Sequence, residues 1–253
     1  MSVTLEQVGR VATVMLDRPP VNVLNLELLR ELHLRLDAVA EKPAIDLLLL
    51  QGAGERAFSA GVDIKDHTRD KVPEMLEVVH GVIRKLRALP QITIAVVHGA
   101  CLGGACELAS ACDFIVASEE SSFATPEITV GCYPPVAVAR FASLIGYHRA
   151  AEMILTGRTF SAAEAHGIGL VSRLFPAADL EDGVAALKAE LLGKSGAVLR
   201  LTVKALRELS SGEFESSLRR SEQIYRDELL RTKDVEEGVR AFLEKRKPVW
   251  KHR

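Results

Sequence analysis

The amino-acid sequence predicts an α/β fold in which a mainly parallel sheet is followed by a helical carboxyl-terminal region. Short apolar runs typical of buried strands alternate with amphipathic helical segments through the first half of the 253-residue chain. Glycine-marked turns separate several of these segments, and after Pro134 nearly every segment has helical periodicity. No internal repeat, low-complexity tract or flexible linker is apparent, so we expect one α/β core with a helical tail.

The first half opens with a predicted hairpin, Val3 to Val8 and Val11 to Leu16, around the turn Gly9-Arg10. Asn25 can cap a first helix, in which apolar residues recur every three or four positions, and a second helix is expected from Asp70 to Leu89. The expected strands of the parallel sheet are Leu47 to Gln51, Thr93 to Val97 and Phe114 to Ala117.

The second half is predicted to be helical, with one short strand at Gly169-Leu170-Val171. We place a core at residues 1–195 and a helical region at residues 196–253, which we expect to pack on the core or on a neighbouring subunit. The expected helices are Val136 to Ile145, Arg149 to Leu155, Ser161 to His166, Leu180 to Leu192, Gly196 to Leu209, Phe214 to Leu230 and Asp234 to Lys247.

Composition and charge argue against several classes of function. With 32 basic and 34 acidic side chains the net charge is −2, so no global field attracts nucleic acid or an anionic membrane. No apolar run approaches the ~20 residues that span a bilayer, and the amino terminus lacks the features of a signal peptide. The four cysteines lie within residues 101–132 in no C-x-x-C pattern, so we interpret them as reduced thiols of a cytoplasmic protein.

Two glutamates in separate turns suggest paired acid and base chemistry. Gly103 and Gly104 follow a predicted strand and open a short helix, so the N–H of Gly104 has no acceptor within the helix and suits an oxyanion. Glu107 lies about one turn later, on the same helix face as this N–H. Glu127 lies in a second turn, after Pro126.

Each of these residues also has a purely structural interpretation. The two glycines are compatible with a tight turn alone, Glu107 with a first-turn acid that favours the helix dipole, and Glu127 with a surface acid in a loop. Residues 52–57 imitate a dinucleotide-binding fingerprint, but Phe58 to Gly61 interrupt the helix that would bind the pyrophosphate, so nicotinamide binding is not expected. The histidine spacing does not indicate a metal site.

Over nearly its whole length the chain resembles the crotonase, or enoyl-CoA hydratase/isomerase, superfamily. The motifs that carry the resemblance occur in the family's order: Arg18-Pro19 with Asn22-Val23-Leu24, AFSAGVDIK (57–65), HGACLGGACELASACD (98–113), TPEITVG (125–131), LTGRTFSAAEAHGIGLVSRLF (155–175) and GVRAFLEKRKP (238–248). This resemblance implies a crotonase-like ββα spiral core with a carboxyl-terminal helical trimerisation region.

The resemblance also implies roles for individual residues. Backbone N–H groups of Val62 and Gly104 would form an oxyanion hole for the thioester carbonyl. Glu127 would be the protonated donor to the α-carbon, and Glu107 would position and activate water. The residues implied for binding the substrate and its coenzyme A are Val21, Ala60, Asp63, Ile64, Phe242 and Lys245. The last two would come from the terminal helix of the same subunit or of a neighbouring one.

The implied function is hydration of an α,β-unsaturated acyl-CoA, with no cofactor beyond the coenzyme A of the substrate, in a homotrimer or a hexamer built as a dimer of trimers. Two departures from the family pattern are Ala105 in place of a third glycine and the run Cys132 to Ala137, where a proline and several glycines are usual. With the segment Asp63 to Leu86, this run resembles the hydratases that act on cyclic dienoyl-CoA esters in aromatic degradation. The alternatives are a Δ3-Δ2 enoyl-CoA isomerase and a non-catalytic crotonase-fold binding protein.

Overall fold

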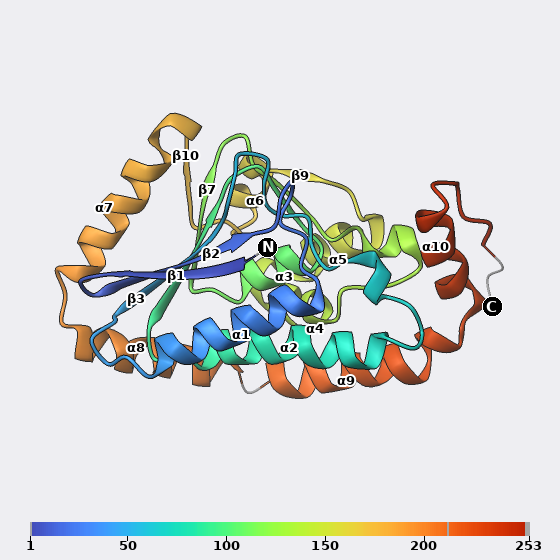
Figure 1. Cartoon of the computed structure of the whole chain (residues 1–253), viewed down its shortest axis with the longest axis horizontal. Coiled ribbons are helices and arrows are strands. Elements are labelled where there is room, and N and C mark those ends of the chain that lie inside the picture. The colour runs from blue at the N-terminus through green and yellow to red at the C-terminus, as the bar shows by residue number, and fades with distance from the viewer. Residues whose placement is uncertain (1, 212, 251–253) are drawn as a thin grey trace.

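The computed structural model describes residues 2–211 and 213–250 and contains a six-stranded sheet with strand order β1-β2-β3-β5-β7-β10 (Figure 1). Its strands are β1 Ser2–Val8, β2 Val11–Asp17, β3 Leu47–Gly52, β5 Ile92–Val97, β7 Phe114–Ser118 and β10 Arg173–Phe175. Only the β1–β2 hairpin is antiparallel; every other neighbouring pair is parallel. The prediction of a mainly parallel sheet is therefore confirmed.

A second, four-stranded sheet was not predicted. Its order is β4-β6-β8-β9, with β4 Ala57–Ser59, β6 Ala100–Leu102, β8 Ser122–Ala124 and β9 Phe160–Ser161. Strands of two or three residues are too short to show a hydrophobic period, so the sequence gives no signal for them. Each of β3, β5 and β7 leads directly into a strand of this small sheet, which places the turns after β4 and β6 side by side.

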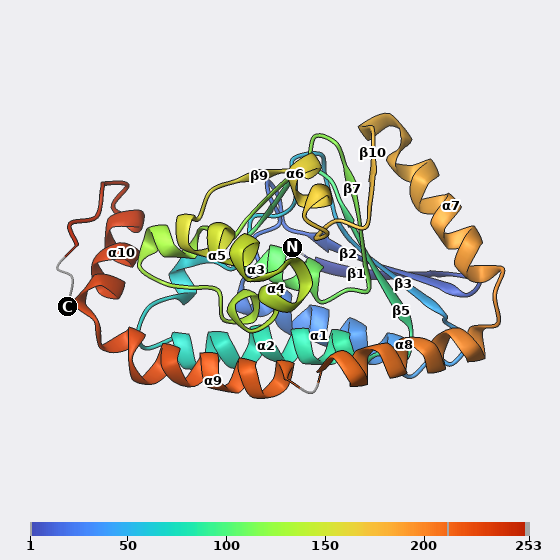
Figure 2. The same ribbon diagram turned by 180° about the vertical axis from the view of Figure 1, so that it is seen from behind.

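Helices cover both faces of the six-stranded sheet. On one face lie α1 (Leu26–Ala40) and α2 (Val72–Ala88), and the predicted cap is present because Asn25 Oδ1 accepts from the N–H of Leu28 at 3.1 Å. On the other face lies α7 (Leu180–Leu192), together with part of α8 (Gly196–Ser211) (Figures 1 and 2). Alternate residues of the central strands therefore enter two different apolar clusters, which explains why these strands are continuously apolar.

The remaining helices are α3 Gly104–Ser110, α4 Pro135–Ile145, α5 Tyr147–Thr156, α6 Ala162–Gly167, α9 Phe214–Asp227 and α10 Lys233–Leu243. Short 3₁₀ turns, η1 Ile64–Asp66, η2 Pro126–Val130, η3 Ala177–Asp179 and η4 Leu229–Arg231, connect several elements. The final helix ends at Leu243, four residues before the predicted end.

The predicted strand at Gly169-Leu170-Val171 is wrong. Gly169 has a φ of +86°, and the N–H groups of Leu170 and Val171 both donate to the carbonyl of Ala165, so this segment closes the end of α6. The strand begins only at Arg173, where the backbone reaches β7. A glycine followed by two apolar residues is compatible with either structure, and the helix end determines the outcome.

Two carboxyl-terminal helices lie close to the glycine turns. Helix α9 runs beside α2 along one edge of the molecule, and α10 lies at the end farthest from α7 (Figures 1 and 2). A Cβ at Gly238 of α10 would approach the Val130 carbonyl oxygen of η2 to 2.3 Å, so α10 packs on η2 with backbone in direct contact. The carboxyl-terminal helices thereby form walls around the segment that carries Glu127.

Candidate active site

A cavity of about 280 Å³ contains both predicted glutamates and both predicted backbone donors. Val62 comes from the turn after β4, Gly104 and Glu107 from the start of α3, and Glu127 from η2. Three sequence segments that the small sheet and its turns bring together thus meet at one place.

The predicted donors Val62 and Gly104 lie next to each other. A Cβ built on Gly104 would lie 3.6 Å from the backbone nitrogen of Val62 and 2.6 Å from its Cγ2. Leu24 bonds the backbone on both sides of Val62, because its N–H donates to the Gly61 carbonyl at 2.8 Å and its carbonyl accepts from the Asp63 N–H at 3.1 Å. Gly104 is the first residue of α3, so its N–H has no acceptor within the helix. Two adjacent N–H groups are available for one ligand oxygen.

Helix α4 holds the carboxylate of Glu107. The side chain is buried, and its Oε1 accepts from the N–H of Ala137 at 2.9 Å, in the first turn of α4. Burial raises the pKa of Glu107, while the charge of His80 and the N–H groups of Ala137 and Val136 oppose this rise. The departure from the family pattern at Pro134-Pro135 therefore forms a helix start, in which Pro135 has a backbone angle suited to the first position.

Glu127 lies in a contrasting environment. Its Oε2 is buried and has no hydrogen-bond partner among the described residues, and its Oε1 approaches Gly103 so closely that a Cβ there would be 2.7 Å away. Burial, and secondarily the charge of Glu107, raise the pKa of Glu127 to about 8. At neutral pH this carboxyl is mainly protonated, whereas the helix start favours the ionised form of Glu107.

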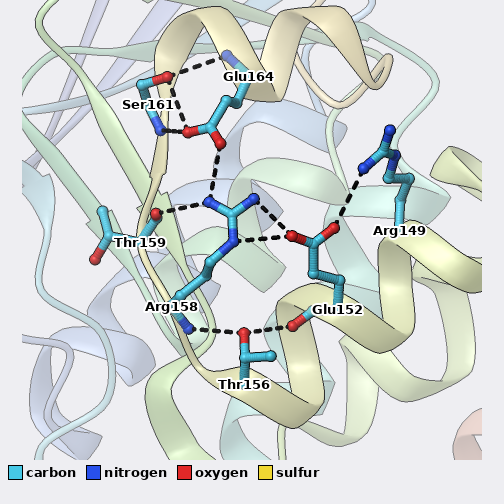
Figure 3. Close-up of polar contacts among 7 residues, drawn as sticks. All are labelled: Arg149, Glu152, Thr156, Arg158, Thr159, Ser161 and Glu164. Carbon is cyan, nitrogen blue, oxygen red and sulfur yellow. Dashed lines mark hydrogen bonds and ion pairs between the residues drawn. The ribbon is translucent and has the colours of Figure 1, made fainter.

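A polar network centred on Arg158 links α5 to the start of α6 (Figure 3). The Arg158 guanidinium donates to Glu152 at 3.0 and 2.8 Å and to Glu164 at 2.9 Å, which ties α5 to the start of α6. From α5, the Met153 carbonyl accepts from the hydroxyl of Thr125, two residues before Glu127. The family-like segment after Leu155 therefore supports the loop of Glu127 without reaching the cavity.

The end of the cavity beyond the glutamates is mostly apolar and has aromatic walls. Tyr133 and Tyr225 pack edge to face with ring centroids 5.1 Å apart, and the Tyr133 hydroxyl donates to the Ser221 carbonyl at 2.6 Å. Tyr225 comes from α9, and no local pattern in the sequence marks it as a site residue. The other residues that line this part include Met75, Leu76, Val79, His80 and Pro135.

The predicted coenzyme A residues divide into two groups. Ala60, Ile64 and Phe242 line the cavity, and Phe242 comes from α10 of the same chain. Val21, Asp63 and Lys245 lie outside the lining. Of these, Val21 accepts from the N–H of Ala60 at 2.9 Å, Asp63 caps η1 and lies 3.6 Å from Arg18, and Lys245 follows α10 at the surface. Their roles in binding the nucleotide stay predictions.

The cysteines have the environment expected of inert thiols. All four are buried and free, and Cys106 has its pKa raised by a hydrogen bond with Cys101 and by burial. Burial also raises the pKa of Cys112 to about 12 and that of Cys132 to about 11. Within residues 2–211 and 213–250 no cluster of metal-ligating side chains is found, and no helix there is long and apolar enough to cross a membrane.

Comparison with known proteins identifies relatives over the full length of the chain. The family model described as enoyl-CoA hydratase/isomerase matches residues 6–253. The cyclohexa-1,5-dienecarbonyl-CoA hydratase of Thauera aromatica is 31% identical over 100% of this chain and 97% of its own. A probable enoyl-CoA hydratase of Rhizobium meliloti (strain 1021) is 38% identical over 98% of this chain and 97% of its own.

Solved structures agree with the predicted fold. An enoyl-CoA hydratase from Mycobacterium avium subsp. paratuberculosis K-10 superposes with a TM-score of 0.89 at 28% identity, covering 99% of this chain and 98% of that one. An enoyl-CoA hydratase from Bacillus anthracis superposes with a TM-score of 0.80 at 32% identity and covers both chains completely. The crotonase-like fold class is therefore confirmed, and the chain belongs to the enoyl-CoA hydratase/isomerase family.

Proposed function

We propose that this protein is a hydratase that adds water to the double bond of an α,β-unsaturated acyl-CoA thioester. The observation that carries the proposal is one cavity in which two glutamates face two adjacent backbone N–H donors. Glu107 accepts from a backbone N–H, whereas Oε2 of Glu127 has no hydrogen-bond partner among the described residues. The names of the relatives support the same activity.

The backbone donors would stabilise the charge that develops during the reaction. Addition of water to a conjugated thioester moves negative charge onto the thioester oxygen, and the N–H groups of Val62 and Gly104 are adjacent donors for that oxygen. Each preorganised donor of this kind contributes about 3 kcal/mol to stabilisation of the transition state.

The two glutamates would divide the transfer of protons. The protonated carboxyl of Glu127 delivers its proton to the α-carbon, and the carboxylate of Glu107 orients the water whose oxygen forms the new bond. The water releases one proton inside the site, so Glu127 regains a proton from the site or the solvent before the next turnover.

We further propose that the acyl group is a ring, as in cyclohexa-1,5-diene-1-carbonyl-CoA. Tyr133 and Tyr225 line the cavity and pack edge to face with each other, so the cavity has an aromatic wall. The relative from Thauera aromatica bears the name of a hydratase for this substrate. A flat, unsaturated ring can pack against such aromatic side chains.

We propose that the protein needs no cofactor other than the coenzyme A of its substrate, and that it acts in the cytoplasm as a homotrimer or as a hexamer. Val21, Asp63 and Lys245 would bind the nucleotide end of the substrate outside the acyl cavity. The composition, with its net charge of −2, gives no support to a nucleic-acid partner.

The test follows the ultraviolet absorbance of crotonyl-CoA and of cyclohexa-1,5-diene-1-carbonyl-CoA, with product masses checked for one added water. We expect the wild type to hydrate the ring thioester and both Glu107→Gln and Glu127→Gln to abolish hydration. Hydration of crotonyl-CoA with no reaction of the ring thioester would contradict the ring proposal. Migration of the double bond of a 3-enoyl-CoA, with no water uptake by any thioester, would indicate an isomerase instead.

A further inference from the structure

A second acid–base unit adjoins the two glutamates in the same cavity. His80 of α2 is 1% exposed and lines the cavity, and its Nδ1 lies 2.6 Å from Glu222 Oε1 of α9. The residues are 142 positions apart in the sequence, so their contact exists only because α2 and α9 run side by side (Figures 1 and 2). A buried imidazole that contacts a carboxylate on one side and a cavity on the other is a frequent arrangement for proton transfer.

The carboxylate that contacts His80 is itself fixed. Arg84 donates to Glu222 Oε1 at 2.9 Å and is held in turn by Glu215 at 3.2 Å. Burial disfavours the charge of Glu222, but the contacts with His80 and Arg84 outweigh it and lower the pKa of this carboxyl to about 2. Glu222 is therefore an ionised acceptor at neutral pH, and it keeps a proton on Nδ1 of His80.

This arrangement directs the other ring nitrogen to the substrate. With the proton of the ring on Nδ1, the lone pair of Nε2 is free to accept, and Nε2 makes no hydrogen bond to any residue in the described part of the chain. His80 and Glu107 line the same cavity. An imidazolium formed here would lie between the carboxylates of Glu107 and Glu222.

We propose that His80 is a further catalytic residue, whose Nε2 binds the attacking water together with Glu107 and takes the proton that this water releases. Glu222 and Arg84 are positioning residues that fix the tautomer and orientation of the ring. This inference rests on the proposed hydratase function. Oε1 of Glu107 already accepts from the N–H of Ala137. Glu107 therefore orients the water and does not take its proton.

The atoms balance in this step. The water oxygen forms a bond to the substrate carbon, one water O–H bond breaks and its proton goes to His80 Nε2, and Glu127 transfers its proton to the α-carbon. The site then holds an imidazolium and an ionised Glu127, with no change in its total charge. Return of the proton from His80 to Glu127, through solvent once product has left, restores the starting state.

The experiment separates the activation of water from the rest of the chemistry. Hydration of the ring thioester is compared with exchange of the α-hydrogen of cyclohexanecarbonyl-CoA in deuterated water near pH 8, where about half of Glu127 is ionised. Exchange needs Glu127 and the two backbone donors but no attacking water. A variant that lacks only the water-activating base should lose hydration and keep exchange.

We expect His80→Gln to lower kcat for hydration by about 10²-fold, with KM and the exchange rate changed by less than about threefold. Glu222→Gln removes the charge but keeps an acceptor, and about a tenfold loss of kcat is expected. His166→Gln, far from the cavity, is the matched control and should hydrate normally.

The possible results distinguish this inference from the proposed function. If the wild type hydrates neither thioester, the hydratase proposal and this inference are both overturned. If the wild type and His80→Gln hydrate equally well, only the role of His80 is overturned. Parallel loss of hydration and exchange in both His80→Gln and Glu222→Gln would assign the pair a purely structural role and would also contradict it.

Discussion

At the scale of single residues, the site depends on giving two identical side chains different chemistry. Glu107 is held by an N–H at the start of α4, which favours its charge, whereas Glu127 has a buried oxygen without a partner, which disfavours charge. This difference between the two carboxyl groups arises from their surroundings in the folded protein and cannot be predicted from the two glutamates in the sequence. In the sequence, the signals that they act together are the neighbouring turns and the family motifs that contain both glutamates.

The first prediction concerns the pH dependence of hydration. The pKa of Glu127 is raised to about 8, and the protonated form is the proposed donor, so kcat should be constant below this value and fall as pH rises above it. The measurement is kcat at saturating ring thioester between pH 6 and pH 10, with the folded state checked by circular dichroism. A rate that rises through pH 8 would mean that Glu127 acts as a base in this direction.

The same carboxyl should influence stability. Folded protein keeps the proton of Glu127 up to about pH 8, whereas an unfolded glutamate releases it near the ordinary value of 4.5. The folded state therefore binds more protons than the unfolded state between pH 4.5 and about pH 8. The contribution of Glu127 to stability is complete below the unfolded pKa and is lost as pH rises through the folded pKa. The free energy of unfolding of Glu127→Gln, relative to that of the wild type, should thus rise between pH 5 and pH 9 by on the order of a few kcal/mol. Urea unfolding at both values measures this difference, and equal differences would contradict the assigned pKa.

The third prediction concerns the glycine that faces Glu127. Gly103 has a φ of +55°, and a Cβ there would meet Glu127 Oε1 at 2.7 Å, so Gly103→Ala should cost about 1–3 kcal/mol of stability and reduce kcat. Gly81 of α2 provides the control, since nothing lies within 4 Å of its Cβ position, and Gly81→Ala should stabilise by about 0.5–1 kcal/mol. Thermal unfolding and hydration rates of the two variants are compared. An active, stable Gly103→Ala would show that the turn has more room than the structure describes.

At the scale of elements, the long segments could be predicted and the short ones could not. The apolar faces of α1 and α2 and the buried strand β3 follow from periodicity, and the structure buries the predicted residues of α1. The four strands of the small sheet have no period, and the turn after α6 imitates a strand in composition. In the site, motifs marked Glu107 and Glu127, but Tyr225 reaches the cavity and Glu222 reaches His80 only through the packing of α9.

The packing of α10 on η2 gives a prediction about substrate binding. Phe242 lines the cavity from α10, and the close contact of Gly238 with the Val130 carbonyl sets the distance between these elements. Gly238→Ala should push α10 outward and raise KM by about tenfold with a smaller change in kcat, because Phe242 moves with this helix whereas Glu127 belongs to η2. Gly167→Ala, at a helical glycine with nothing within 4 Å, is the control and should leave KM unchanged. A loss of kcat at constant KM would contradict this separation.

At the scale of the whole molecule, the two ends of the chain contribute different parts of the function. The sheet and the turns after its strands bring together Val62, Gly104, Glu107 and Glu127, whereas α9 and α10 provide the wall of the acyl cavity and the contact with His80. The lining of the acyl cavity includes Phe242 of the same polypeptide. Association of subunits is therefore expected to stabilise the fold rather than complete the acyl site.

Helix α8 presents an exposed apolar face that leads to the last prediction. Val198, Leu201, Leu206 and Leu209 are between 60% and 88% exposed and lie within one side of the helix. A cluster of this kind on a single chain is typical of an interface, and the family resemblance implies a second copy of the chain as the partner. Leu201→Glu with Leu206→Glu should therefore convert a trimer or hexamer into monomers, as light scattering coupled to size-exclusion chromatography would measure. The control is Leu34→Glu on α1, which alters another exposed leucine outside this face and should leave the assembly intact. The cavity residues described above come from one chain, so monomers should keep some hydration activity but unfold at a lower temperature. A wild type that is monomeric at micromolar concentration would contradict the proposed assembly.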